Sequence, residues 1–264
     1  MTKDSMHQQA AQFLYQAHRD RRPYENLPES FRPRTIDEAY AIQEAFKDLV
    51  AAERGSIAGY KIALTTPVMQ RMVGYDAPCF GSVFESGVHR SPASVTAGGY
   101  GRLGAECEVA VRLVAGLPAS GAPYDRAKIA EAVGALMAAF ELVDDRAADY
   151  SDIHFFSLVA DNAWNAGVVL GPEVTEWRGL DLGAARGEMT INGDSAGEGH
   201  GRDVLGHPLD ALAWLANNLA ERGKELSAGM IVMTGSIVST KFLDHGDKAT
   251  FAFDGLGEIA LSVG

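Results

Sequence analysis

The sequence predicts an α+β fold, in which a helical N-terminal cap region, residues 1–55, precedes a β-rich catalytic body, residues 56–264, in one integrated domain. Two observations predict this division. Apolar residues keep a helical spacing up to Gly55, and short β-like runs separated by Gly, Asp and Asn dominate after it. A third observation concerns topology. Strands and helices do not alternate regularly along the chain, so the sequence disfavours a doubly wound parallel sheet.

The N-terminal region is predicted to hold two helices. Apolar residues recur every three or four positions from residue 10 to residue 17, and Pro23 follows. The second helix begins after Thr35, whose hydroxyl can accept a hydrogen bond from the amide of Glu38 while the Glu38 carboxylate reaches back, a capping box. Gly55 ends it.

The body is predicted to be mostly strands with two helices. The expected strands are Gly59–Leu64, Cys107–Ala115, Met137–Val143, Ala166–Leu170, Glu188–Ile191, Met230–Thr234, Ala249–Phe253 and Glu258–Val263. The expected helices are Tyr124–Ala135 and Pro208–Arg222. Gly99–Gly104 has the spacing of a dinucleotide-binding loop, but a β-like segment follows it where a helix is required, so it is read as a glycine-rich loop.

Composition excludes several classes of protein. Of the 264 residues 47% are hydrophobic and 22% charged, a globular balance. The formal net charge of −12 disfavours nucleic acid as a partner. No stretch approaches the ~20 apolar residues that cross a bilayer, and two cysteines are too few for a disulfide framework. A cytoplasmic protein without a membrane partner is expected.

Three acidic residues stand out as candidate metal ligands. Glu106 and Glu108 lie two apart in an alternating segment, so their carboxylates leave the same face of a strand. A solvated face would explain that pair alone. Glu141, however, lies inside an apolar run, where an unpaired carboxylate is costly and a cation is needed. Three carboxylates with open positions describe a Mg²⁺ or Mn²⁺ site.

Lys61 is a lone cation in an apolar strand. The simplest interpretation is that the Lys61 ammonium reaches solvent while its apolar stem packs against the strand. The functional interpretation is that Lys61 binds a substrate carboxylate or transfers a proton. Burial would lower the pKa of its ammonium toward the range in which it can transfer a proton.

The motifs together resemble the 2-keto-4-pentenoate hydratase / 4-oxalocrotonate decarboxylase family, which is related to the fumarylacetoacetate hydrolases. The resemblance covers nearly the whole chain. It is carried by Gly59–Thr65, the Glu106/Glu108 pair, Glu141–Arg146, Ala160–Ala163, Gly206–Pro208, Leu219–Gly223, Thr234–Ser236 and Gly255–Gly257.

The resemblance implies a mixed β-roll of the fumarylacetoacetate hydrolase C-terminal type carrying Mg²⁺ or Mn²⁺. It matches Glu106, Glu108 and Glu141 to the three metal ligands. It also matches Lys61 to the active-site lysine, implies Asp161 as a further catalytic residue, and implies Leu64, Asn162 and Ser236 as substrate-binding residues.

The implied substrates are 2-oxo acids or their enols, as in bacterial breakdown of aromatic compounds. A divalent cation can chelate the carboxylate and 2-oxygen of such an acid and stabilise an enolate. Hydration of a 2-hydroxy-2,4-dienoate to a 4-hydroxy-2-oxo acid is the first expectation. Decarboxylation of a 4-oxalocrotonate-type diacid is the alternative.

Cys79 departs from the family pattern, in which hydratases place an Asp and decarboxylases an apolar residue. Because a thiol is a poor substitute for a carboxylate, Cys79 keeps both reactions open as a third catalytic candidate.

The sequence disfavours two other functions. Hydrolysis of acylpyruvates is disfavoured because no His or Glu lies between Lys61 and Phe84. A non-catalytic partner of a sister pathway enzyme is disfavoured because it has no use for clustered acids. A homo-oligomer is expected, with a complex with a sister enzyme as a further possibility.

Overall fold

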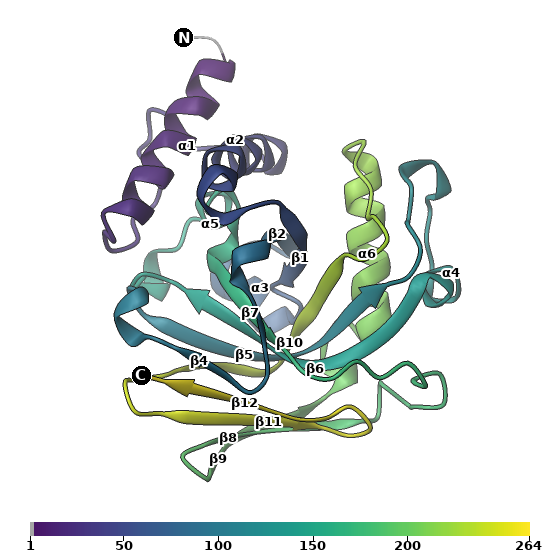
Figure 1. Cartoon of the computed structure of the whole chain (residues 1–264). Helices are drawn as coiled ribbons and strands as arrows, with labels where there is room; N and C mark the ends of the chain where they lie inside the picture. The colour runs from purple at the N-terminus through teal and green to yellow at the C-terminus, as the bar shows by residue number, and fades with distance from the viewer. Residues whose placement is uncertain (1–2) are drawn as a thin grey trace.

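The computed structural model describes residues 3–264, and it shows an α+β fold with two mixed sheets (Figure 1). The seven-stranded sheet contains β2 (Cys79–Phe84), β1 (Ile57–Ala63), β10 (Ile231–Phe242), β5 (Leu103–Leu113), β6 (Val133–Asp144), β7 (Asn165–Leu170) and β3 (Val88–Arg90) in that order. The five-stranded sheet contains β4 (Ala93–Val95), β12 (Gly257–Val263), β11 (Lys248–Phe253), β8 (Arg186–Ile191) and β9 (Asp194–His200). The helices are α1 (Lys3–Arg19), α2 (Ile36–Arg54), α3 (Pro67–Val73), α4 (Arg126–Ala132), α5 (Phe155–Ala160) and α6 (Pro208–Glu221).

The seven-stranded sheet curls strongly. Strands β2 and β7 contact each other although four strands separate them in the sheet. The curl encloses a small apolar cluster that includes Val83, Met137, Val168 and Met233. Lys61 pairs in register with Met233, so its side chain leaves the same face as that cluster. The enclosed face is therefore where a buried polar site can form.

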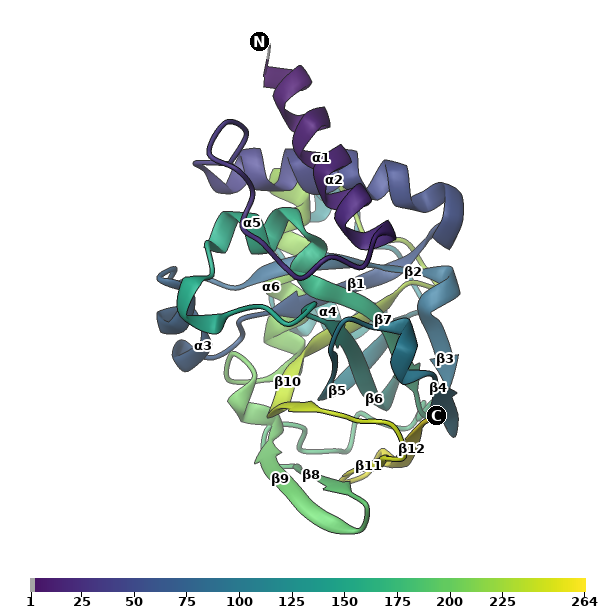
Figure 2. The same ribbon diagram turned by 90° about the vertical axis from the view of Figure 1, so that its left-hand side faces the viewer.

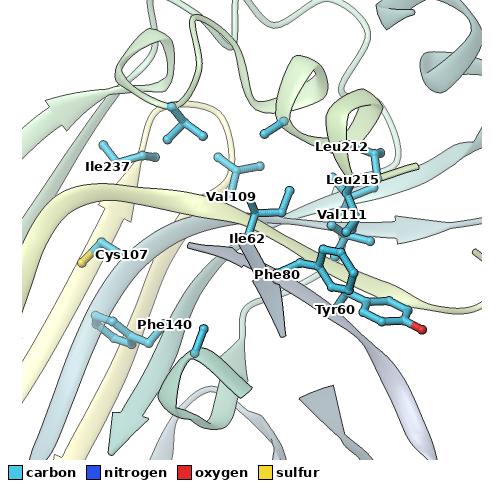
Figure 3. Packing of buried hydrophobic residues seen from close by; sticks show 14 of the residues in the cluster. Tyr60, Ile62, Phe80, Cys107, Val109, Val111, Phe140, Leu212, Leu215 and Ile237 are labelled. Carbon is cyan, nitrogen blue, oxygen red and sulfur yellow. The ribbon is translucent and has the colours of Figure 1, made fainter. Parts of the chain in front are cut away.

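The opposite face of the curled sheet carries the main core. Residues of β1 and β5, among them Ile62 and Val109, pack with Leu212 and Leu215 of α6 (Figure 3). The five-stranded sheet lies below the curled sheet in both views (Figures 1 and 2), and Phe140 of β6 joins the same core. This core fixes β5 and β6, the strands that carry the acidic residues.

Helices α1 and α2 lie on the side of the curled sheet opposite the five-stranded sheet (Figure 2). Leu14 of α1 and Phe46 of α2 share a cluster with Phe84 of β2 and Ala160 of α5. Helix α2 begins as predicted. The amide of Glu38 donates to Thr35 Oγ1 at 3.2 Å, and the Glu38 carboxylate accepts from the amide of Arg34.

Some predicted elements differ from the structure. The helix expected over Tyr124–Ala135 stops at Ala132, because Val133 begins β6 and pairs with Leu113 of β5. Strands β2, β3, β4 and β9 were not predicted. In β2 all six residues are buried, so no alternation marks it. None of the helices in residues 3–264 is long and apolar enough to span a membrane.

Candidate active site

The structure brings the three predicted acids together. Glu106 and Glu108 lie on β5, and Glu141 of β6 is the cross-strand partner of Glu106. One carboxylate oxygen from each residue lies within 4.8 Å of the others. Like charges directly opposite each other destabilise a sheet, so this arrangement requires compensation from positive charge.

Each carboxylate is held by a donor from another part of the fold. The Thr240 hydroxyl of β10 donates to Glu106 Oε1. The amide of Gly235 donates to Glu108 Oε2 at 2.7 Å, and Asn165 Nδ2 donates to Glu141 Oε1 at 2.9 Å. Such supporting hydrogen bonds orient the ligands of a metal and fix which oxygen faces it.

The remaining oxygens fit a divalent cation. Glu108 Oε1 and Glu141 Oε2 are buried without a hydrogen-bond partner among the described residues. Burial, followed by the neighbouring carboxylates, raises the pKa of Glu108 well above its usual range. Three ionised carboxylates and the Lys61 ammonium together carry two net negative charges, which one divalent cation would balance. Carboxylate oxygens are also the ligands that Mg²⁺ and Mn²⁺ prefer.

Gly235 meets a steric requirement at this site. Its φ is +119°, and a Cβ at this position would lie 2.4 Å from Thr65 Cγ2. Only glycine adopts this conformation freely and allows the close approach. The resulting irregularity in β10 aims the Gly235 amide at Glu108.

Lys61 is buried beside the acids, with its Nζ 2.9 Å from Glu141 Oε1. Burial alone would lower the pKa of its ammonium, as the sequence suggested, but the charges of Glu141 and Glu106 outweigh burial and raise the pKa above its usual value. The expected lowering is therefore wrong for the chain without a bound cation. The strand also does not let Lys61 snorkel, since its side chain is only 2% exposed.

A cavity of about 270 Å³ opens over this cluster. Lys61 and Glu106 line it, as do the predicted substrate-binding residues Leu64 and Ser236. Leu64 has a left-handed backbone, with φ of 59°, and the Ser236 hydroxyl donates to the carbonyl of Val238 at 2.5 Å. The arrangement combines hard oxygen ligands, one ammonium and an apolar enclosure in one place.

Cys79 is fully buried and is not among the residues that line this cavity. Burial raises the pKa of its thiol to about 12, although the nearby Lys61 ammonium lowers it. The thiol is therefore protonated at neutral pH and is a poor acceptor of protons. Asp76 and Glu85, other acids near this strand, do not line the cavity either.

Asp161 and Asn162 lie next to the cavity but do not line it. Asp161 is fully buried and binds Arg146 Nη2 at 2.8 Å and His18 Nε2 at 2.7 Å. Asn162 Oδ1 accepts from the amide of Ser82 at 2.7 Å, and its Nδ2 donates to the carbonyl of Ser82. The structure thus places both residues in the support of the site rather than at its surface.

These contacts hold a strained turn. Asn162, Ala163 and Trp164 have consecutive φ values of 55°, 44° and 60°, a left-handed conformation that costs L-residues free energy. Ala163 and Trp164 line the cavity, and the next residue, Asn165, donates to Glu141. The turn therefore links the Asp161 ion pairs to the wall of the cavity and to a candidate ligand.

Asp161→Asn should lower the free energy of unfolding by about 3–5 kcal/mol, because it leaves the guanidinium of Arg146, only 3% exposed, without its charged partner. Urea unfolding at neutral pH measures this. Asp20→Asn is the matched control, since Asp20 pairs with Arg22 at 3.9 Å on the surface and such pairs contribute about 0–1 kcal/mol. Equal effects of the two substitutions would contradict the assigned role of Asp161.

The same pair predicts a pH dependence. Although burial opposes it, the charges of Arg146 and His18 hold the pKa of Asp161 below its usual 3.8. A lowered pKa stabilises the folded state fully above pH ~4, and this contribution is lost as the pH falls through the folded-state pKa. The difference in unfolding free energy between wild type and Asp161→Asn should therefore shrink below pH 4. A constant difference would contradict the ion pair.

Comparisons with known proteins bear on this geometry. The model of the fumarylacetoacetate (FAA) hydrolase C-terminal family matches residues 77–263. The chain belongs to the fumarylacetoacetate hydrolase family. It is 34% identical to a 2-keto-4-pentenoate hydratase of Paraburkholderia phymatum over 99% of both chains. It is 29% identical to a 4-oxalocrotonate decarboxylase of Pseudomonas putida, covering 86% of this chain and 84% of that one.

A solved structure agrees over the whole chain. That structure is a 4-oxalocrotonate decarboxylase from Pseudomonas putida G7 complexed with magnesium and adipate. It superposes with a TM-score of 0.91 at 26% identity, covering 100% of this chain and 98% of that one. The predicted family and the predicted enzymatic nature of the protein are thereby confirmed.

The sequence reasoning missed the residues that support the acids. Asn165 carried a weak signal, a polar residue at the entry to an apolar strand. Thr240 and Gly235 carried none, because their role depends on the pairing of β10 with β5. His18 and Arg146 likewise meet Asp161 only through the tertiary fold.

Proposed function

We propose that this enzyme is a hydro-lyase that hydrates a 2-hydroxy-2,4-dienoate to a 4-hydroxy-2-oxo acid, with Mg²⁺ or Mn²⁺ held by Glu106, Glu108 and Glu141. One observation carries the proposal: three carboxylates converge within 4.8 Å beside Lys61, and two of their buried oxygens, on Glu108 and Glu141, have no hydrogen-bond partner among the described residues. Lys61 and Glu106 of this group line the cavity. The named hydratase at 34% identity and the magnesium in the solved decarboxylase support it.

The residues of the chain have separable roles in this reaction. A bound divalent cation would hold the substrate's carboxylate and 2-oxygen and stabilise negative charge on that oxygen. Lys61 Nζ, oriented by Glu141, holds a proton at the base of the cavity. Trp164 and Leu158 enclose the reacting atoms and limit the entry of bulk water. Asp161 and Asn162 act as positioning residues through the turn that they anchor.

Cys79→Ser should change kcat/KM by less than about threefold, because a thiol with a pKa of about 12 carries no proton to or from the substrate at neutral pH. Steady-state kinetics on the dienoate check this. Cys107→Ser is the matched control, since both cysteines are fully buried in the main core and neither lines the cavity. A loss beyond a hundredfold for Cys79→Ser alone would give the thiol a catalytic role.

Decarboxylation is the second candidate. The solved decarboxylase supports it, because it superposes on the whole chain. The same three acids would serve both reactions, because in both of them negative charge develops on the 2-oxygen.

One assay separates the candidates. The purified protein with Mg²⁺ is incubated with 2-hydroxypenta-2,4-dienoate and, separately, with 2-oxo-3-hexenedioate, and the products are identified by mass spectrometry. We expect 4-hydroxy-2-oxopentanoate from the first substrate, which adds one water to the dienoate. Release of CO₂ from the second substrate, without hydration of the first, would overturn the proposal in favour of decarboxylation.

Other expectations remain part of the proposal. We infer a cytoplasmic enzyme that forms a homo-oligomer, with the N-terminal region 1–55 and the body 56–264 folding as one unit. The shared cluster of Leu14, Phe46, Phe84 and Ala160 supports that unit.

A further inference from the structure

We propose that the cavity selects substrates with an uncharged, apolar tail and discriminates against those with a second carboxylate at the far end. This inference rests on the function proposed above and specifies its substrate class. It follows from the charges and the apolar side chains that line the cavity beyond the candidate metal ligands.

The described residues that line the cavity offer no free cation to pair with a second carboxylate. Among the described residues that line the cavity, Lys61 is the only cation, and its Nζ is already paired with Glu141. The two acidic residues of the lining are Glu106 and Asp203. Asp203 is exposed, and its carboxylate would repel an anionic tail. An anion placed there would lose its hydration without gaining an ion pair.

The outer wall is apolar instead. Helix α3 contributes Val68, Met69 and Met72, and Ile153 lines the same cavity. Val68 is 66% exposed and Met72 38%, although large apolar side chains at these exposures are uncommon in residues 3–264. Apolar surface left open beside a binding site is typical of a surface that a ligand covers. Methionine also adapts its shape to different apolar groups.

The cavity is large enough to hold a substrate tail in addition to the 2-oxo acid group. Its volume of about 270 Å³ equals that of roughly nine liquid waters. A tail that extends from the 2-oxo acid group would contact the side chains of α3 that line the cavity. Each methylene that covers this wall should strengthen binding about fourfold.

A matched pair of unreactive ligands tests the inference. The ligands 2-oxohexanoate and 2-oxoadipate share the 2-oxo acid group and differ only in a terminal methyl or carboxylate. Calorimetry with the Mg²⁺-loaded protein should show 2-oxohexanoate binding at least about tenfold more tightly. Equal or tighter binding of 2-oxoadipate would overturn the inference and leave the proposed function standing. Binding of neither ligand would overturn both.

A variant locates the selectivity. Val68→Lys places an ammonium on the wall and should reduce the preference for 2-oxohexanoate at least about tenfold. Val114→Lys is the matched control, since Val114 is 65% exposed and does not line the cavity, and its preference should equal that of the wild type. Because both valines are exposed, neither substitution buries a charge, and circular dichroism checks that both variants fold. An unchanged preference in Val68→Lys would show that α3 does not contact the tail.

Discussion

Glu108→Gln should abolish Mg²⁺-dependent hydration, with a loss of at least about a thousandfold in kcat, because it removes a buried anionic ligand that no other residue replaces. The fold should survive. Glutamine keeps an oxygen that can accept the hydrogen bond from the Gly235 amide, and the charge it removes is one that burial and neighbouring carboxylates disfavour.

Thermal melting separates loss of the metal from loss of the fold. Mg²⁺ at a hundred times its Kd should stabilise the wild type by about 2.7 kcal/mol and raise its melting temperature by several degrees. The same addition should leave Glu108→Gln unchanged. Glu258→Gln is the control, since Glu258 is exposed on β12 and should respond like the wild type. A full Mg²⁺ response in Glu108→Gln would remove Glu108 from the ligands.

Lys61→Met should reduce kcat/KM by about a hundredfold to ten-thousandfold, the range expected for loss of a group that transfers a proton. Methionine keeps most of the apolar stem, so packing against the enclosed face is largely preserved. The variant should also melt lower than the wild type in the absence of metal, because the carboxylate of Glu141 loses its buried cationic partner.

Added Mg²⁺ should restore most of that lost stability without restoring activity, since a cation can offset the charge of Glu141 but cannot replace the proton on Nζ. Lys248→Met, at an exposed lysine on β11, provides the control for the loss of a positive charge. Wild-type kinetics for Lys61→Met would contradict the role of the lysine.

The acids were predictable because their signal is local. Glu106 and Glu108 share a face through the two-residue period of a strand, and Glu141 contrasts with the apolar run around it. In the structure one carboxylate oxygen from each of these residues lies within 4.8 Å of the others. The α+β class was predictable for the same reason, from helical spacing before Gly55 and short strands after it.

The features that could not be predicted from the sequence depend on contacts between segments that are far apart in the chain. Asp161 belongs to a motif of the predicted site, but its carboxylate pairs with His18, 143 positions away, and does not line the cavity. The raised pKa of Lys61 depends in the same way on Glu141 and Glu106, which other strands bring to it. Strand β2 is hidden because both of its faces are covered.

The most direct test of the account is a crystal structure of the protein grown with Mn²⁺ and 2-oxohexanoate, with anomalous data that locate the metal. We predict one anomalous peak about 2.1–2.3 Å from carboxylate oxygens of Glu106, Glu108 and Glu141, in contact with the 2-oxo acid group of the ligand. An anomalous peak elsewhere, or a ligand bound in the cavity with no metal among these three residues, would contradict the account.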